Sequence, residues 1–305
     1  MADMDADWPL PRPVKLFKRS EVSPDSSKLT RTSDIASGFT VLATPLVAEA
    51  VQRARGLAGH GDAEAFHQLR VAFRKLRALY WAYSRYLGTE VTAQATEEFK
   101  RLAAVAGAAR DWDIVSGLLK TAQGSRASMS VLIDAAFEKR AQAVKKSQSL
   151  IKVEDVEAFL NDALQRAQTT LASRGSDLPM RNFAEDRVRR AKRALRKRCK
   201  YVTTRETPRE KDLHEVRKAG KKLRYLLEFF APIVKREHGY LIKHLTAVQK
   251  KLGEFNDLAA SEGLIQRSSF DNVPAEVVQA SLQWLEKKKR RRMRAAVRRV
   301  VAISS

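Results

Sequence analysis

The stretch FHQLRVAFRKLR (residues 66–77) is repeated with the same spacing as LHEVRKAGKKLR (residues 213–224). Counted from the histidine, both copies carry Arg at +3, basic residues at +7 and +8, Leu at +9 and Arg at +10. The two histidines lie 147 residues apart, about half of the 305-residue chain. Self-similarity over half the length indicates a duplicated unit.

In an α-helix, the offsets 0, +3, +7 and +10 fall within roughly 80° of one face. That face carries histidine and cations, and the opposite face carries apolar side chains. The two rows are His67, Arg70, Arg74 and Arg77, and His214, Arg217, Lys221 and Arg224. Because like charges three or four residues apart repel each other, the rows predict a bound anion. A solvated basic face is the alternative.

The other cations of the repeats are assigned to the same anion site. Arginine can hold a phosphate through paired N–H donors, whereas lysine acts as a mobile point charge. The histidines are expected to donate to the anion, so that binding takes up protons as the pH falls from about 7.5 towards 6. A structural hydrogen bond is the alternative role for each histidine. The added cations are Lys75, Lys218 and Lys222.

A second short pattern follows each copy, as GAARD (residues 107–111) and GEFND (residues 253–257). Each glycine is expected to end a helix. The aspartates Asp111 and Asp257 then have two possible roles. Each caps the next helix, or each orients an arginine of the basic row across the bundle.

The formal net charge of +23 is concentrated in three segments. Residues 66–86 carry +5, residues 186–224 carry +12 and residues 284–299 carry +8, so the remainder of the chain is slightly acidic. A charge that served solubility alone would be spread out. The distribution predicts a polyanionic partner: nucleic acid, polyphosphate, an anionic membrane or an acidic protein.

Two further basic segments extend the predicted site. A helix over residues 181–200 is expected to lie antiparallel to the second repeat helix. Its cationic face includes Arg189, Lys192, Arg193 and Arg196. Near the C-terminus, six consecutive cations (residues 287–292) must wrap around a helix, so some of them face solvent. Of these six, Arg291 is assigned to the site.

Helical periodicity runs from residue 35 to residue 300 without strand-like alternation, which predicts an all-α fold of antiparallel helical bundles. The proline-rich residues 1–32 are predicted to be a flexible arm. Residues 33–175 and 176–305 are predicted to form two helical halves. Separate helices are expected over residues 235–252 and 257–268.

Several classes of protein are disfavoured by composition. The single cysteine, Cys199, permits neither an intrachain disulfide nor a zinc cluster of thiolates, which suits a reducing cytoplasm. No apolar run approaches the ~18–20 residues of a membrane span. The acidic N-terminus is unlike a signal peptide. No cofactor or metal is expected.

The doubled pattern, H-x-x-R-V-x-x-R-K-L-R and H-x-x-R-K-x-x-K-K-L-R-Y, with the R-D and G-x-x-N-D stretches that follow it, resembles the CHAD (conserved histidine α-helical) domain. The resemblance covers roughly residues 33–300. It implies two helical bundles related by pseudo-twofold symmetry around a basic groove or pore. It also implies binding of inorganic polyphosphate and association with polyphosphate granules. Tyr225 of the second copy is matched by Ala78 in the first, so a symmetric role for this tyrosine is in doubt.

The sequence therefore predicts a cytoplasmic, non-catalytic polyphosphate-binding protein. Nucleic-acid binding is the main alternative, with weak nonspecific binding expected, because the basic faces lack interleaved aromatic residues and no base-reading motif is present. A phosphohydrolase or kinase with His67 or His214 as nucleophile is disfavoured, since there is neither a phosphate-cradling glycine loop nor clustered acids beside the motif. A two-histidine metal site is disfavoured because its expected neighbours are cations.

Overall fold

The computed structural model describes residues 29–60, 63–123, 129–174, 178–234 and 238–302. Every regular element in these residues is helical, which confirms the predicted fold class. Of the predicted arm, only residues 29–32 are described. The helices are α1 (Ile35–His60), α2 (Ala63–Leu87), α3 (Thr89–Val105), α4 (Ala108–Gln123), α5 (Ser130–Leu150), α6 (Val153–Arg174), α7 (Met180–Thr203), α8 (Glu210–Phe229), α9 (His238–Gln266) and α10 (Ala275–Val301).

The two repeats form α2 and α8, and both helices are amphipathic as predicted. The apolar sides of both helices are buried. Removing one large apolar side chain from water stabilises the fold by about 1.5–3 kcal/mol, so this side fixes the orientation of each helix. The buried residues include Phe66, Leu69, Phe73 and Leu76 on α2, and Leu213, Val216, Leu223 and Leu226 on α8.

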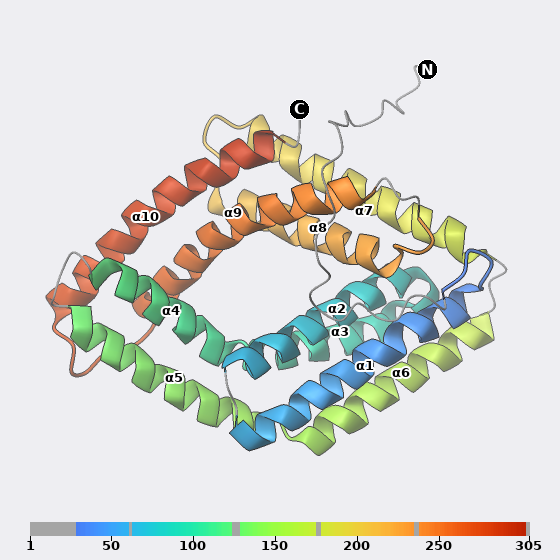
Figure 1. Ribbon diagram of the computed structural model, residues 1–305, viewed down its shortest axis with the longest axis horizontal. Helices are drawn as coiled ribbons and strands as arrows, with labels where there is room; N and C mark the ends of the chain where they lie inside the picture. Colours follow the sequence, from blue (N-terminus) through green and yellow to red (C-terminus); the bar gives the residue numbers. More distant parts are fainter. Residues whose placement is uncertain (1–28, 61–62, 124–128, 175–177, 235–237, 303–305) are drawn as a thin grey trace.

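The helices form two bundles and a hairpin, arranged around an open centre (Figure 1). Helices α1, α2, α3 and α6 pack together, and α7, α8, α9 and α10 form the second group. The α4–α5 hairpin extends from the first group and contacts α9 and α10 of the second. Helices α2 and α8 are in contact, so the two repeats meet where the groups join.

The main hydrophobic core contains residues from both predicted halves. For example, the ring of Phe183 on α7 lies 4.5 Å from that of Tyr83 on α2. A second buried cluster lies between the α4–α5 hairpin and the ends of α9 and α10, and it includes Trp112, Leu132, Leu258 and Leu285. The predicted boundary between the halves falls at residues 175–177, outside the described residues.

Helix α9 corrects the prediction of two separate helices over residues 235–252 and 257–268. It is continuous, with Gly253 in its interior. An interior glycine costs a helix only about 1 kcal/mol relative to alanine. Burial of the neighbouring Leu252 and Phe255 offsets that cost. Asp257 is therefore inside a helix and caps nothing.

Helix α1 corrects the statement that no apolar run suits a membrane span. Residues Ile35–Leu57 have the length and composition of such a span, with a mean hydropathy of 1.3. In the structure 44% of this window is buried, and α1 packs against α2 and α6. Its apolar composition thus serves the core of the first bundle.

Candidate functional site

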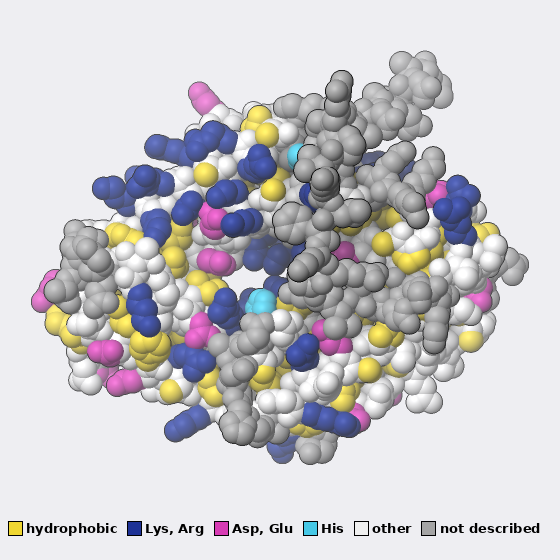
Figure 2. Space-filling view, in the orientation of Figure 1, with side chains coloured by type: hydrophobic (Ala, Val, Ile, Leu, Met, Phe, Trp, Pro, Cys, Tyr) yellow, Lys and Arg dark blue, Asp and Glu magenta, His cyan; other side chains and the backbone are white. Residues whose placement is uncertain are grey.

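Five cations of the two repeats gather where α2 meets α8. We call them the central basic cluster: Arg70, Arg74, Arg217, Lys221 and Arg224. Burial, followed by the charges of the four arginines, lowers the pKa of Lys221 to about 6. Figure 2 shows the molecule hollowed near its centre, with Lys and Arg side chains gathered around the hollow. The structure therefore brings together the main part of both predicted cationic rows.

Two members of this cluster have buried N–H groups without acceptors. The Nε atoms of Arg74 and Arg217 are buried and have no hydrogen-bond partner among the described residues. The buried Nε of Arg224 makes no hydrogen bond within those residues, but it lies 3.5 Å from Oε1 of Glu228, with which it forms an ion pair. Leaving a buried donor unpaired costs about 1–3 kcal/mol. Burial lowers the pKa of Arg74 and of Arg217, but a guanidinium remains charged near neutral pH. Two unpaired donors on two contacting helices indicate a site for a ligand rich in acceptor atoms.

Two aspartates offset part of the charge. Arg70 Nη1 lies 3.0 Å from Asp111 Oδ1, and Asp257 interacts with Arg217 and Lys221. Burial raises the pKa of Asp257 against the opposing effect of these two cations. The second of the two roles predicted for Asp111, orienting an arginine across the bundle, is thus confirmed. Glu228 adds a third carboxylate, 3.5 Å from Arg224 Nε. Four arginines and Lys221 thus face three carboxylates, so the central basic cluster keeps an excess of positive charge.

The two histidines differ in their surroundings. His67 is half-buried on α2, whereas His214 on α8 is exposed. The Nδ1 atom of His214 lies 3.1 Å from Oδ1 of Asn256 on α9. A structural hydrogen bond is therefore present for His214, and the prediction that either histidine donates to an anion stays a prediction.

Lys75 was assigned to the anion site, and the structure places it elsewhere. Its side chain is buried, and Nζ lies 3.7 Å from Oε2 of Glu49 on α1. Because successive residues of a helix are about 100° apart, position +8 turns away from the row that contains Arg74. Lys75 belongs to the α1–α2 contact.

The predicted face of α7 also needs correction. Arg189, Arg193 and Arg196 are exposed, and Lys192 is half-buried. Arg189 pairs with Asp186 of its own helix at 3.1 Å. These side chains lie on the side of α7 opposite to its buried apolar face, so they do not join the central basic cluster.

The cations of α7 that do reach the repeat helices are Arg187 and Arg198, which sequence reasoning missed. Nη2 of Arg187 donates to the carbonyl oxygen of Trp81 on α2 at 2.9 Å. Nε of Arg198 lies 3.7 Å from Oε2 of Glu215 on α8. Both arginines flank the apolar stripe that includes Val188, Leu195 and Cys199. This stripe marks the buried side of α7, so it could have identified both arginines from the sequence.

The remaining predicted residues lie at three different places. Lys218 is exposed and pairs with Glu215 at 2.9 Å. Arg77 and Lys222 are half-buried beside Arg187 and Arg198. Arg291 is exposed on α10.

Part of the cationic run on α10 holds the second group of helices together. Lys289 forms ion pairs with Glu210 of α8, Glu262 of α9 and Glu286 of α10. Arg292 pairs with Glu254 of α9 at 3.1 Å. These cations are already compensated by carboxylates, so they are poor candidates for an anion site.

Gly107, between α3 and α4, leaves space for the guanidinium of Arg70. A Cβ atom at this position would lie 2.6 Å from Arg70 Nη1 and 3.0 Å from the carbonyl oxygen of Ala103. We expect Gly107→Ala to displace Arg70 and weaken binding of an anionic ligand by about 10-fold, since a charge-assisted hydrogen bond contributes about 1.5 kcal/mol. Isothermal titration calorimetry measures the change.

Gly117→Ala is the matched control, because no atom lies within 4 Å of a Cβ built there. It should leave affinity unchanged and stabilise α4 slightly. Equal affinities for the two variants would contradict the role given to Gly107.

Comparison with known proteins identifies the family of this chain. The profile of the CHAD domain matches residues 42–266. The chain belongs to the CHAD domain family. The crystal structure of the CHAD domain from the plant Ricinus communis has a TM-score of 0.75 at 20% identity, covering 92% of this chain and 97% of that one. PptA from Streptomyces chartreusis has a TM-score of 0.56 at 14% identity, covering 89% of this chain and 99% of that one. At these identities, the likeness of both structures concerns the fold.

Curated relatives are more similar in sequence but longer. The uncharacterized proteins MT2285 and Rv2226, from two strains of Mycobacterium tuberculosis, are 27% identical over 226 residues, which is 70% of this chain. The matched region is 42% of the length of each relative. This CHAD domain protein thus spans about two fifths of the curated relatives that it matches.

Proposed function

We propose that this CHAD domain protein binds inorganic polyphosphate, without catalysis, at the central basic cluster. The observation that carries the proposal is the pair of buried, unpaired Nε donors on Arg74 and Arg217. Polyphosphate offers about one negative charge and several acceptor oxygens per repeating unit. It can satisfy donors from both helices at once, because each unit presents oxygens on more than one side.

The surroundings of the cluster favour a ligand without bases. Proteins that bind single-stranded nucleic acid stack the bases on exposed aromatic rings. The aromatic side chain that interacts with Arg74 is Tyr225, which is 3% exposed. A buried ring cannot act as a stacking platform, so nucleic acid is expected to bind only weakly and nonspecifically.

Calorimetric titration with polyphosphates of graded length, at salt concentrations of about 0.05 M and 0.2 M, tests the proposal. Affinity should fall steeply with salt, because the polyanion releases counterions when it binds. Long-chain polyphosphate should displace DNA far better than DNA displaces polyphosphate at about 0.2 M salt. Absence of binding at both salt concentrations would refute the proposal, and so would stronger binding of DNA.

Two parts of the proposal need their own measurements. Sustained phosphate release from polyphosphate by the purified protein with Mg²⁺ would overturn the non-catalytic assignment. Localisation to polyphosphate granules in the cytoplasm follows from the proposed binding. A fluorescent fusion should colocalise with granules, and an Arg74→Met fusion should do so less.

A further inference from the structure

A second group of cations surrounds one tryptophan next to the central basic cluster. We call it the Trp81 cluster: Arg77 and Trp81 of α2, Arg187 and Arg198 of α7, and Lys222 of α8. Lys222 Nζ lies 3.7 Å from the centre of the Trp81 ring, and Arg187 Cζ lies 4.5 Å from it. Three helices thus direct positive charge to the neighbourhood of a single aromatic ring.

The charge of the Trp81 cluster is only partly compensated. Burial, followed by the charges of Arg198, Arg187 and Arg77, lowers the pKa of Lys222 to about 8, while Glu215 acts in the opposite direction. Glu215 is shared, because it also pairs with Lys218. A cation over an aromatic ring gains about 0.5–2 kcal/mol, so Trp81 stabilises these cations without neutralising them.

One member of this cluster also lacks an acceptor. Arg187 is 9% exposed, and its Nε is buried without a hydrogen-bond partner among the described residues. Its Nη2 is anchored to the carbonyl oxygen of Trp81. The guanidinium is thus fixed in place while one of its donors remains unused, as at the central basic cluster.

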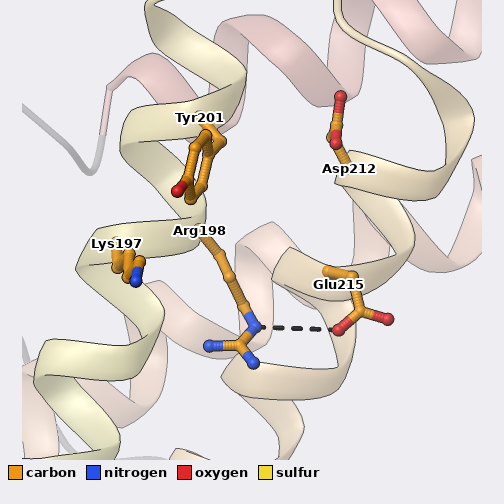
Figure 3. Close-up of a pocket in the computed structure, with 5 residues that line it drawn as sticks. All are labelled: Lys197, Arg198, Tyr201, Asp212 and Glu215. Atoms are coloured by element: carbon orange, nitrogen blue, oxygen red, sulfur yellow. Dashed lines mark ion pairs between the residues drawn. The ribbon is translucent and has the colours of Figure 1, made fainter.

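The two clusters adjoin along the repeat helices. Arg77 lies about one helical turn after Arg74 on α2, a rise of about 4.5 Å, and its charge acts on Lys222 of α8. A pocket of about 280 Å³ lies between α7 and α8, where the Arg198 guanidinium extends towards Glu215 (Figure 3). Arg198 lines this pocket and also belongs to the Trp81 cluster, so the pocket opens beside that cluster.

We propose that the Trp81 cluster is a second phosphate subsite, which a polyphosphate chain reaches only when it is long enough to extend beyond the central basic cluster. This inference rests on the proposed function. It assigns Lys222, Arg77 and Arg198 as the cations that hold the additional phosphates, with Arg187 fixed behind them. Affinity should then rise sharply at the chain length that first reaches both clusters.

The test compares Lys222→Gln with Lys211→Gln across polyphosphates of graded length. Both residues lie on α8 and both variants lose one positive charge, but Lys211 is exposed and belongs to neither cluster. We expect Lys222→Gln to bind long chains about 10-fold more weakly and short chains as the wild type does, because one charge-assisted contact is lost. Lys211→Gln should bind every length as the wild type does.

Two results would overturn the subsite. One is an equal loss for Lys222→Gln at every chain length, and the other is no loss at any length. If the wild type binds no polyphosphate at all, the proposed function fails and the subsite fails with it. Binding by the wild type with an unchanged length dependence in Lys222→Gln refutes the subsite alone.

Trp81 provides a second readout. Because Lys222 Nζ lies over its ring, a bound phosphate should shift this cation and change the fluorescence of Trp81. Long polyphosphate should change the emission of the wild type, whereas a chain confined to the central basic cluster should not. The change should disappear in Trp81→Phe, and its persistence in that variant would contradict the subsite.

Discussion

Arg74→Met should weaken polyphosphate binding by about 10–100-fold and raise the free energy of unfolding of the unliganded protein by about 1 kcal/mol. The buried Nε of Arg74 is unpaired. Burial, and repulsion by Arg70 and Arg224, disfavour its charge against the opposing effect of Tyr225. A hydrogen bond to a charged group contributes about 1.5–3 kcal/mol, and an unpaired buried donor costs a similar amount. The substitution therefore removes a ligand contact and a source of instability together. Calorimetry gives the affinity, and denaturant unfolding gives the stability.

Arg193→Met is the control for this prediction. It removes the same charge from the exposed side of α7, so affinity should change less than about 3-fold at physiological salt, where separated surface charges are largely screened. Its stability should be unchanged. Loss of both affinity and stability in Arg74→Met would mean that Arg74 holds the fold together and is not kept for a ligand.

Lys221 should make ligand binding depend on pH. Its pKa in the folded protein is about 6, so the side chain is mostly neutral at pH 7.5. A bound polyanion favours the charged form, and binding should take up a proton, up to about one per site. Calorimetry at pH 7.5 in buffers of different ionisation enthalpy measures this uptake. Lys221→Arg should retain binding and lose the uptake, because arginine stays charged in both states.

The same residue should make the stability of the unliganded protein depend on pH. The pKa of Lys221 in the unfolded chain is about 10.4, well above its value in the folded protein. The unfolded state therefore binds more protons between pH ~6 and ~10, and the free energy of unfolding should rise with pH in that interval. The contribution of Lys221 to this rise should be absent in Lys221→Met.

The histidines provide the control for proton uptake. The sequence assigned that uptake to His67 and His214, whereas the structure points to Lys221. In the double variant His67→Gln/His214→Gln, uptake should remain. Its disappearance there, together with its persistence in Lys221→Arg, would restore the assignment to the histidines.

The sequence was sufficient for the features that depend on helical spacing. The apolar sides of α2 and α8 are buried, and the +3 and +7 positions of both rows meet in the central basic cluster. Helical periodicity determines which side of one helix carries which residues, so these features could be read within a single repeat. The ion pair of Asp111 with Arg70 was one of two open alternatives.

Features that depend on neighbouring helices were not predictable in the same way. The ion pair of Lys75 could not be foreseen from the repeat, because its partner, Glu49, lies 26 residues earlier on another helix. Lys75 was therefore assigned to the ligand. On α7, the anion-binding face was predicted on the side with the most cations, whereas the apolar residues determine which side is buried. Trp81 gave no signal, because its cationic partners come from two other helices.

The unbroken course of α9 has a mechanical consequence. Leu245 and Leu252 of this helix belong to the main core, and Leu258 and Ile265 belong to the second cluster. The main core and the second cluster are thus joined by one continuous helix. Neither can move relative to the other unless the 29 residues of α9 bend or a packed interface breaks. Polyphosphate should therefore bind and dissociate through rearrangement of side chains while the helices keep their positions. Amide exchange along the middle of α9 should be equally slow with and without polyphosphate.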